Sequence, residues 1–332
     1  MKKIQQFEPN LGEEEKKELL SVIDSGWYTE SKKTREFENI FANFVGRKYA
    51  VATTSGTVAL CIAIQGLGLK KEDEVIIPDL TFVASPNSVI LAGSKVSLVD
   101  IQKDNLCLDI EKTKQNVSDK TKAIMPVDFN GRTPNLISLK EFAEKSDLFI
   151  IEDSCHGIGS FYGGKHTGCY SDVGIFSFST PKIITTGQGG MLVTDNKELY
   201  EKFRMIKDFG RDVDKKHQME NAFDHVEMGY NFKFTEFQAA IGIAQMKKLP
   251  KRIEHNKKMF QLYRENLASI PEIEFVDLDL KMSVPWFVDI LLPDKKIRQG
   301  LVEHLKQSGI GTRKFYPPIH KLLPYQSIDG DF

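Results

Sequence analysis

The sequence predicts an α/β protein with a mostly parallel sheet. Between residues 50 and 194, short apolar runs alternate with amphipathic stretches, which is the pattern expected where helices connect the parallel strands of one sheet. Several of these runs are apolar on both faces, as the central strands of a covered sheet are. The chain has 332 residues, 41% of them hydrophobic, so it can bury a large core, and we expect a major and a minor lobe.

The predicted elements follow one another in chain order. Two helices open the chain, over residues 13–25 and 35–44, because their apolar residues recur at helical spacing. Seven strands follow, each bounded by turn or cap residues, over residues 49–53, 74–77, 95–99, 123–127, 148–152, 174–178 and 190–194. These elements belong to a large domain that covers residues 1–249.

The C-terminal part of the chain is more helical. Residues 234–249 and 251–268 predict two helices broken at Pro250, because proline disrupts a helix interior. A smaller α+β domain over residues 250–332 would hold a strand at 284–291 and a helix at 295–308. The last residues follow a proline-containing loop with no closing helix, so we expect the natural chain to continue past Phe332.

Charge and cysteine usage narrow the function classes. Lys and Arg number 45 and Asp and Glu 46, so there is no overall field that would attract nucleic acid or an anionic membrane. The four cysteines are dispersed without a CxxC pair, which argues against a zinc site and favours reduced thiols. No apolar run resembles a signal peptide or a membrane span. We expect a cytoplasmic protein that acts on a small molecule.

The most informative stretch is GIFSFSTPKIITTGQGGMLVTD, residues 174–195, in which Lys182 is the only charged residue before the final aspartate. Burial disfavours an ammonium group and lowers its pKa, as is needed for a lysine that attacks an aldehyde to form a Schiff base near neutral pH. A surface lysine on a connecting loop explains this stretch equally well. Other positions decide between the two interpretations.

Asp153 ends an apolar run, FIIED, which places it at the carboxyl edge of the predicted sheet, where ligands bind in open α/β folds. A buried aspartate needs a cationic partner, and the protonated pyridine nitrogen of pyridoxal phosphate is one such partner. The alternative is a helix N-cap, a role that short polar residues favour. For Asp153 alone, the cap is the stronger interpretation.

The segment Thr53-Thr54-Ser55-Gly56-Thr57 leaves a predicted strand and opens a helical stretch. Backbone N–H groups at such a helix N-terminus can bind an anion, for example the phosphate of a cofactor. The segment lacks both the Gly-Lys-Ser/Thr of a Walker loop and the Gly-x-Gly-x-x-Gly of dinucleotide folds. Ordinary helix capping remains the alternative.

Together, these three elements resemble the sugar aminotransferase family often called the DegT/StrS group, within the aspartate aminotransferase fold (fold type I) of pyridoxal phosphate enzymes. The resemblance extends over nearly the whole chain. Its motifs, in order, are SGWYT (25–29), FENIFANFVG (37–46), TSGTVAL (54–60), PDLTFVA (78–84), EDSCHGIGS (152–160), FSFSTPKIITTGQGG (176–190), GYNF (229–232) and GIGTRKFYPPIHKLLPY (309–325).

The resemblance implies roles for individual residues. Lys182 would carry pyridoxal 5'-phosphate as a Schiff base and later move the proton at the substrate carbon, and Asp153 would pair with the pyridine nitrogen. Phe82 matches the aromatic residue that stacks on the ring, and His156 matches a residue that touches its phenolic oxygen. The remaining cofactor positions are a phosphate cradle and a residue from the neighbouring subunit, which implies a homodimer with shared active sites: Ser55, Gly56, Thr57 and Ser177 for the cradle, and Asn231 for the neighbour.

Four positions depart from the family pattern. His156 stands where Gln is more frequent, Gln188 where Glu is usual, Lys233 where Arg is usual, and Asp128 where a histidine is frequent. These changes affect the expected substrate contacts rather than the cofactor. Phe82, His156 and Asn231 could also be a core residue, a loop histidine and a turn former, respectively.

The family implies L-glutamate as the amino donor, and the segment GTRKFYPPIH (311–320) resembles the closing motif of perosamine- and viosamine-type 4-aminotransferases. The expected acceptor is therefore C4 of a nucleotide-linked 4-keto-6-deoxyhexose, in deoxyamino sugar biosynthesis of the kind that supplies lipopolysaccharide O-antigens. Expected substrate residues are Arg313, Lys314, Tyr316 and His320, whose cations suit a diphosphate, although a solvated loop has a similar composition.

Three alternatives remain at the level of sequence. The chain could aminate C3 rather than C4. It could be a pyridoxal phosphate-dependent sugar dehydratase or deoxygenase, but some relatives with that activity carry His in place of the lysine, so Lys182 argues against it. It could also be a regulatory protein that keeps the fold and binds no cofactor.

Overall fold

The computed structural model describes residues 3–212, 224–328 and 330–331. Its centre is an eight-stranded sheet in which β9 runs antiparallel to both of its neighbours and the other pairs are parallel. This arrangement confirms the predicted α/β fold with a mostly parallel sheet. In spatial order the strands are β1 (Tyr49–Thr53), β9 (Gly190–Thr194), β8 (Val173–Ser177), β5 (Phe149–Asp153), β4 (Thr121–Ile124), β2 (Glu74–Pro78), β3 (Lys95–Val99) and β10 (Gly330–Asp331).

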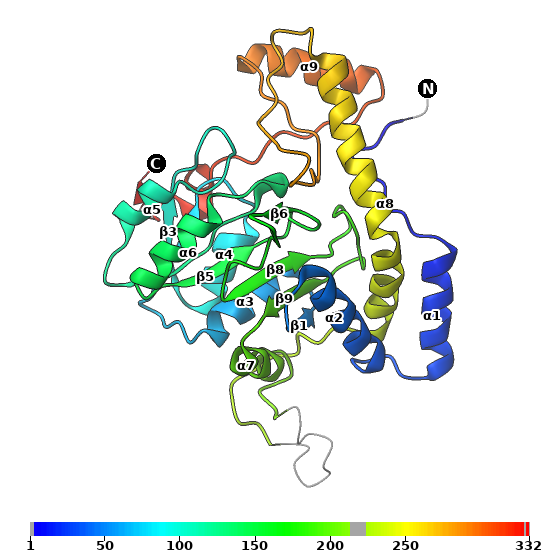
Figure 1. Cartoon of the computed structure of the whole chain (residues 1–332), viewed down its shortest axis with the longest axis vertical. Coiled ribbons are helices and arrows are strands. Elements are labelled where there is room, and N and C mark those ends of the chain that lie inside the picture. Colours follow the sequence, from blue (N-terminus) through cyan, green and yellow to red (C-terminus); the bar gives the residue numbers. More distant parts are fainter. Residues whose placement is uncertain (1–2, 213–223, 329, 332) are drawn as a thin grey trace.

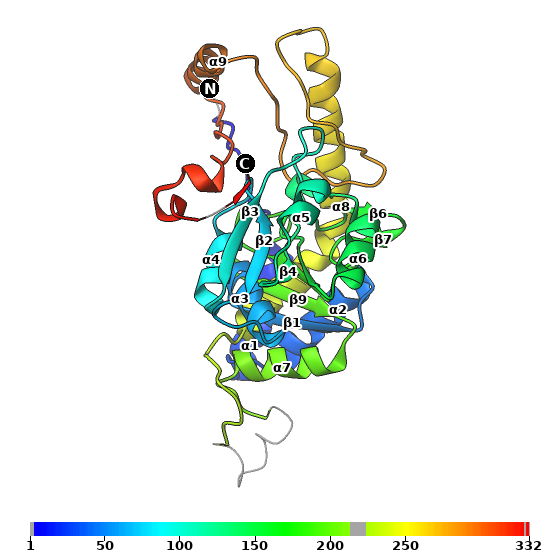
Figure 2. The same ribbon diagram turned by 90° about the vertical axis from the view of Figure 1, so that its left-hand side faces the viewer.

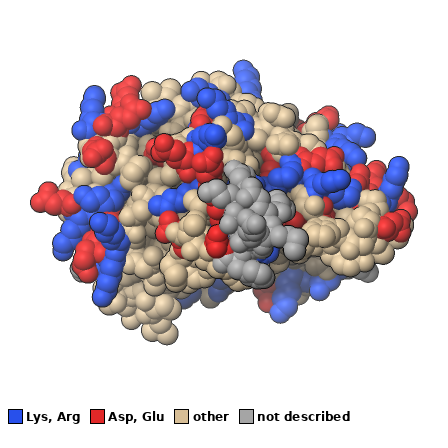
Figure 3. All heavy atoms as spheres, turned by 90° about the horizontal axis from the view of Figure 1, so that it is seen from below, with Lys and Arg blue, Asp and Glu red and all other residues tan. Residues whose placement is uncertain are grey.

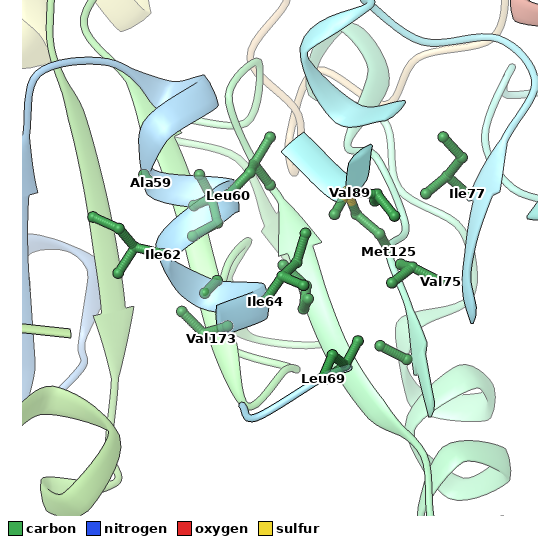
Figure 4. Packing of buried hydrophobic residues seen from close by; sticks show 14 of the residues in the cluster. Ala59, Leu60, Ile62, Ile64, Leu69, Val75, Ile77, Val89, Met125 and Val173 are labelled. Atoms are coloured by element: carbon green, nitrogen blue, oxygen red, sulfur yellow. The ribbon is translucent and has the colours of Figure 1, made fainter. Parts of the chain in front are cut away.

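Helices cover both faces of the sheet (Figure 1). On one face, apolar residues of α3, such as Leu60 and Ile64, pack against strand residues that include Val75 and Val173 (Figure 4). On the other face, Phe37 and Phe41 of α2 pack against Phe176. The covering helices are α2 (Lys32–Val45), α3 (Gly56–Gly66), α4 (Ala84–Ala92), α5 (Ile110–Asn116), α6 (Leu136–Lys145) and α7 (Lys197–Lys207).

The predicted strands agree with the observed ones to within two residues, except at β4. There the strand ends at Ile124, and Val127 forms only an isolated bridge with Asp153. The first predicted helix coincides with α1 (Glu13–Ser25). Short elements connect the larger ones: the hairpin β6 (Phe161–Tyr162) with β7 (Lys165–His166), and the 3₁₀ turns η1 (Phe129–Gly131), η3 (Ile319–Lys321) and η4 (Leu323–Tyr325).

The prediction of two helices broken at Pro250 was wrong. A single helix, α8 (Glu236–Leu267), continues through this proline. Proline removes one hydrogen bond from a helix interior, but Leu249 just before it and Phe260 beyond it are both fully buried. Packing on both sides of Pro250 therefore outweighs the local preference to end the helix. Figure 1 shows α8 running from beside α1 and α2 to the part of the molecule that contains α9 (Lys295–Gln307).

The predicted strand at residues 284–291 was also wrong, because the described residues of this segment form no strand. Their backbone amides bond instead to side chains that lie far earlier in the chain: Val284 donates to Ser160 Oγ at 2.9 Å and Trp286 to Asn130 Oδ1 at 2.8 Å. The helix predicted at 295–308 is confirmed as α9. The domain division after residue 249 stays a prediction.

Glu236, the first residue of α8, fixes the N-terminus of α2. Its carboxylate accepts hydrogen bonds from the backbone amides of Ser31, Lys33 and Thr34, each at 2.9 Å, and from the Thr34 hydroxyl at 2.8 Å. The first amides of a helix have no partner within the helix and carry partial positive charge. A carboxylate some 200 positions away in the chain therefore caps α2.

The surface charges agree with the balanced composition, and the start of the chain pairs with the segment after α9. On the face that Figure 3 shows, basic and acidic side chains are interspersed rather than gathered by sign. Near the chain start, Ile4 exchanges backbone hydrogen bonds with Gly309 and Gly311, just past α9, and Figure 2 shows the N-terminus beside this helix. Among the described helices, none is both long and apolar enough to span a membrane.

Candidate active site

Lys182 lies on the turn between β8 and β9 and is half-buried. Its amine faces the ring of Trp286, with Nζ 3.8 Å from the ring centroid. Burial lowers the pKa of the Lys182 amine from about 10.5 to about 8, although Cys155 and Asp153 act in the opposite direction. The amine can therefore lose and regain a proton near neutral pH. A small pocket around it is lined by Cys155, His156, Ile158, Ile183 and Trp286.

Asp153 is the last residue of β5 and is only 5% exposed. Its carboxylate accepts a hydrogen bond from Ser85 Oγ at 2.9 Å and one from the backbone amide of Cys155 at 3.2 Å. No helix begins directly after Asp153, since the next described element is β6, so the N-cap interpretation is wrong. A carboxylate offers about four acceptor positions, which leaves Asp153 able to accept from a ligand.

The glycine that opens α3, Gly56, lies beside the end of β8 and the turn that follows β5. Ser55 is the N-cap of this helix, and its hydroxyl accepts the backbone amide of Val58 at 3.2 Å. A Cβ atom on Gly56 would lie 3.1 Å from Ser177 Cβ and 3.2 Å from Cys155 Sγ. The structure thus brings Ser55, Gly56 and Ser177 together beside the segment that carries Asp153. The N-terminus of α3 faces this cradle and suits an anion.

His156 is 5% exposed and its ring lies 4.3 Å from that of Trp286, measured between centroids. Burial, and then the charge of Lys182, lower the pKa of His156 well below its usual value, so the ring is neutral at pH 7. The backbone amide of Asn130 donates to Nδ1 at 3.4 Å, which assigns the ring proton to Nε2. A neutral His156 can therefore donate one hydrogen bond, as expected for a contact with a phenolic oxygen.

Phe82 is 51% exposed although it is a large apolar residue. Its ring lies 5.7 Å from that of Tyr316, measured between centroids. An exposed ring face of this kind can pack on a planar ligand. The contact also shows that Tyr316, one of the predicted substrate residues, reaches the large domain next to Phe82.

The other predicted substrate residues differ in their surroundings. Arg313 and Lys314 are exposed, and Arg313 lowers the pKa of Tyr316 while burial raises it more strongly. His320 is paired with Asp79: Nδ1 lies 2.5 Å from Oδ2, and the His320 backbone amide donates to Oδ1 at 2.9 Å. His320 is therefore oriented by a buried carboxylate, which a solvated loop residue would not be.

Asn231 is exposed and forms an isolated β-bridge with Asp208, just past α7. Among the contacts of the described residues, none joins Asn231 to Lys182, Asp153 or Phe82. The idea that it serves the site of a neighbouring subunit stays a prediction.

The family departures are accommodated in different ways. Gln188 is exposed and its carbonyl accepts from Gln238 Nε2 at 2.7 Å, and Lys233 pairs with Asp208 at 3.1 Å. Asp128 is fully buried and accepts a hydrogen bond from the Ser154 hydroxyl. Burial and the nearby Glu152 raise the pKa of Asp128 well above its usual value.

Sequence reasoning missed Trp286, Asn130 and Cys155. Trp286 meets Lys182 and His156 only because the segment around residue 286 packs against the segments of Asn130 and Lys182. No local pattern signals that contact. Cys155 lies in the turn just after β5, two residues past Asp153, so no strand period pointed to it.

Comparison with known proteins agrees with this geometry. A family model described as the DegT/DnrJ/EryC1/StrS aminotransferase family matches residues 9–331. The GDP-perosamine synthases of Vibrio cholerae and Caulobacter vibrioides are 33% and 32% identical, each over 97% of this chain and 87% of the relative.

Solved structures show the same architecture. An Escherichia coli GDP-4-keto-6-deoxy-D-mannose-3-dehydratase with bound hydrated PLP has a TM-score of 0.92 at 28% identity, covering 100% of this chain and 90% of that one. A Helicobacter pylori aminotransferase involved in the biosynthesis of pseudoaminic acid has a TM-score of 0.91 at 29% identity, covering 98% and 88%.

Proposed function

Because the chain belongs to the DegT/DnrJ/EryC1/StrS aminotransferase family, we propose that it is a pyridoxal 5'-phosphate-dependent aminotransferase that moves the amino group of L-glutamate to a nucleotide-linked keto sugar. One observation carries this proposal. The amine of Lys182 lies close enough to the carboxylate of Asp153 to interact with it electrostatically, and Cys155 adjoins both Lys182 and the glycine that opens α3. The named relatives and structural neighbours support the substrate class.

The residues present fit this cofactor. Gly56 lets the α3 N-terminus pack closely against Ser177 and Cys155, where a Cβ atom would be crowded, and the backbone amides of this N-terminus, beside Ser55 and Ser177, would bind the phosphate. Asp153 offers an acceptor for a ring N–H, His156 Nε2 offers a donor, and Phe82 offers an exposed ring face. These are the three kinds of contact that a flat, charged pyridine ring needs.

When bound, pyridoxal phosphate supplies an aldehyde that takes up amino groups and a protonated ring that accepts the electron pair of the neighbouring C–H bond. The chain supplies the proton transfer. With a pKa of about 8, about a tenth of Lys182 is neutral at pH 7, so its amine can remove a proton from the substrate carbon and return it. Ser85 and the Cys155 amide hold the Asp153 carboxylate in place for the ring N–H.

We further propose C4 of a 4-keto-6-deoxyhexose as the site of amination. The C-terminal segment supports this choice because its motif is similar to that of 4-aminotransferases and because the named relatives make perosamine. Arg313 and Lys314 are exposed cations in the segment that carries Tyr316, where a diphosphate would bind, and Asp79 fixes the position of His320 in the same segment. A homodimer in which Asn231 completes the neighbour's site belongs to the same proposal.

Borohydride reduction tests the cofactor assignment. The purified chain loaded with pyridoxal phosphate should be yellow, and reduction followed by peptide mass mapping should place the cofactor on Lys182. Lys182→Ala is the matched control and should take up cofactor without becoming fixed to it. A colourless chain, or fixation at another lysine, would contradict the proposal.

A dehydratase is the second candidate, because one structural neighbour has that activity. Glutamate added to the loaded chain should bleach the yellow form and release 2-oxoglutarate, and a panel of nucleotide-linked keto sugars should then be aminated, with the position read by NMR. Amination at C3 would overturn the C4 assignment. Loss of a sugar hydroxyl without amine transfer would favour the dehydratase.

A further inference from the structure

Trp286 covers the amine of Lys182 from the C-terminal part of the chain. Its indole Nε1 donates to the carbonyl of Pro181, the residue before Lys182, at 2.6 Å. This bond presents the ring face to the lysine, with Nζ 3.8 Å from the ring centroid. The same ring lies 4.3 Å from the ring of His156. Trp286 thus lines the Lys182 pocket and is hydrogen-bonded to the turn that carries the lysine.

Asn130 holds the backbone of Trp286 in this place. It is fully buried and adopts a positive φ of 55°, a conformation that asparagine tolerates better than most residues. Its Oδ1 accepts the amides of Trp286 at 2.8 Å and Phe287 at 3.0 Å, and its Nδ2 donates to the Phe287 carbonyl at 3.0 Å. The side-chain amide of Asn130 thus bonds to the backbone of two consecutive residues, which holds the indole in place.

The charged and titratable groups that act on the Lys182 amine are few. Asp153 and Cys155, both beside β5, favour its charged form, while the amine itself disfavours protonation of His156. Burial disfavours the charged form of the Lys182 amine. An aromatic face within about 6 Å of an ammonium group attracts it through the ring quadrupole, most strongly for tryptophan and where water is excluded. The indole face therefore adds a second attraction besides that of Asp153.

We propose that Trp286 is a positioning residue whose ring face holds the Lys182 amine in its charged form whenever that amine is not bonded to the cofactor. The inference rests on the proposed function, in which Lys182 alternates between a bonded and an unbonded state. In the unbonded state the buried amine must keep the proton that it later returns to the substrate carbon. Trp286 lets it do so without a second carboxylate, which would compete with Asp153 for the ring nitrogen.

Competitive acetylation with mass spectrometry measures the effect on the full chain loaded with pyridoxamine phosphate, in which the lysine is unbonded. The pH midpoint of Lys182 labelling is read against the exposed Lys251. Trp286→Leu keeps an apolar wall without a quadrupole and should lower the midpoint by about half a unit to one and a half units. Trp286→Phe keeps a smaller ring face and should lower it less.

An unchanged or raised midpoint in Trp286→Leu would overturn the proposal, because a ring that merely excludes water would raise the midpoint when it is removed. If that variant fails to fold, Asn130→Gly serves instead, since glycine accepts the positive φ and lacks the amide. Freeing the indole in this way should also lower the midpoint, and no change would overturn the proposal.

The result is separable from the proposed function. A chain that cannot be loaded or reduced onto Lys182 refutes the cofactor assignment. The labelling midpoint can still be measured on the unloaded chain, where the same shift is expected, so the indole contact is decided in either case.

Discussion

Arg132 and Asp289 form a buried ion pair between the η1 turn and the C-terminal part of the chain. The guanidinium Nη1 and Nη2 atoms lie 2.8 and 2.9 Å from the two carboxylate oxygens. Nε also donates to the carbonyl of Asp277 at 2.8 Å and Nη2 to that of Val276 at 3.2 Å. Arg132 is 2% exposed and Asp289 is 4% exposed. We predict that Arg132→Met is strongly destabilising.

The magnitude follows from what the substitution leaves behind. Methionine fills much of the space, but the Asp289 carboxylate becomes an uncompensated buried charge, which costs about 3–5 kcal/mol. This is a large part of the roughly 5–15 kcal/mol that stabilises an ordinary folded domain. It corresponds to an increase of about 10²- to 10⁴-fold in the unfolding equilibrium constant. The carbonyls of Val276 and Asp277 also lose a donor.

Urea unfolding, followed by circular dichroism and by tryptophan fluorescence, measures the loss. The double variant Arg132→Met/Asp289→Leu removes the stranded charge and should recover most of the loss, although the two carbonyls stay without their donor. A single variant that loses under about 1 kcal/mol, or a double variant no more stable than the single, would refute the reasoning.

Three further substitutions test separate parts of the site and core. In Gly56→Val, the new Cβ atom would lie 3.1 Å from Ser177 Cβ and 3.2 Å from Cys155 Sγ. This crowding should weaken pyridoxal phosphate binding at least about tenfold in an absorbance titration; unchanged affinity would count against the cradle. Burial lowers the pKa of His166 to about 4 from 6.5, so the unfolded ring binds a proton first and folding stability falls by up to about 3 kcal/mol as pH drops from 6.5 to 4. The stability of His166→Gln should fall less over that range, and parallel pH profiles would contradict this. Ser55→Ala removes the α3 cap and should cost about 1 kcal/mol in urea unfolding, while Ser55→Thr should cost less.

The features that the sequence predicted well are local ones. The strands are apolar runs bounded by turns, so their positions follow from patterning, whereas the site roles of Lys182, a lone charge between two strands, and Asp153, at the end of one, stay predictions. The cradle around Gly56 was suggested by its small residues. All of these signals lie within a few neighbouring positions of the chain.

The features that it missed depend on distant contacts. Pro250 should end a helix, but buried packing at Leu249 and Phe260 overrides that preference. Residues 284–291 look like a strand because they are apolar, yet their amides find partners in Asn130 and Ser160. Trp286 reaches Lys182 only after this docking. The raised pKa of Asp128 likewise results from burial and the neighbouring Glu152, which no local spacing reports.

The cap that Glu236 places on α2 has a consequence for how the chain is synthesised. A ribosome releases α2 long before residue 236, so its first amides must wait for Glu236, about 200 residues downstream, and the apolar face of Phe37 and Phe41 must wait for Phe176 and Phe178. Contacts of such long sequence separation form late and leave apolar surface exposed in the meantime. The nascent chain is therefore expected to need chaperone protection at its N-terminal helices until α8 has left the exit tunnel.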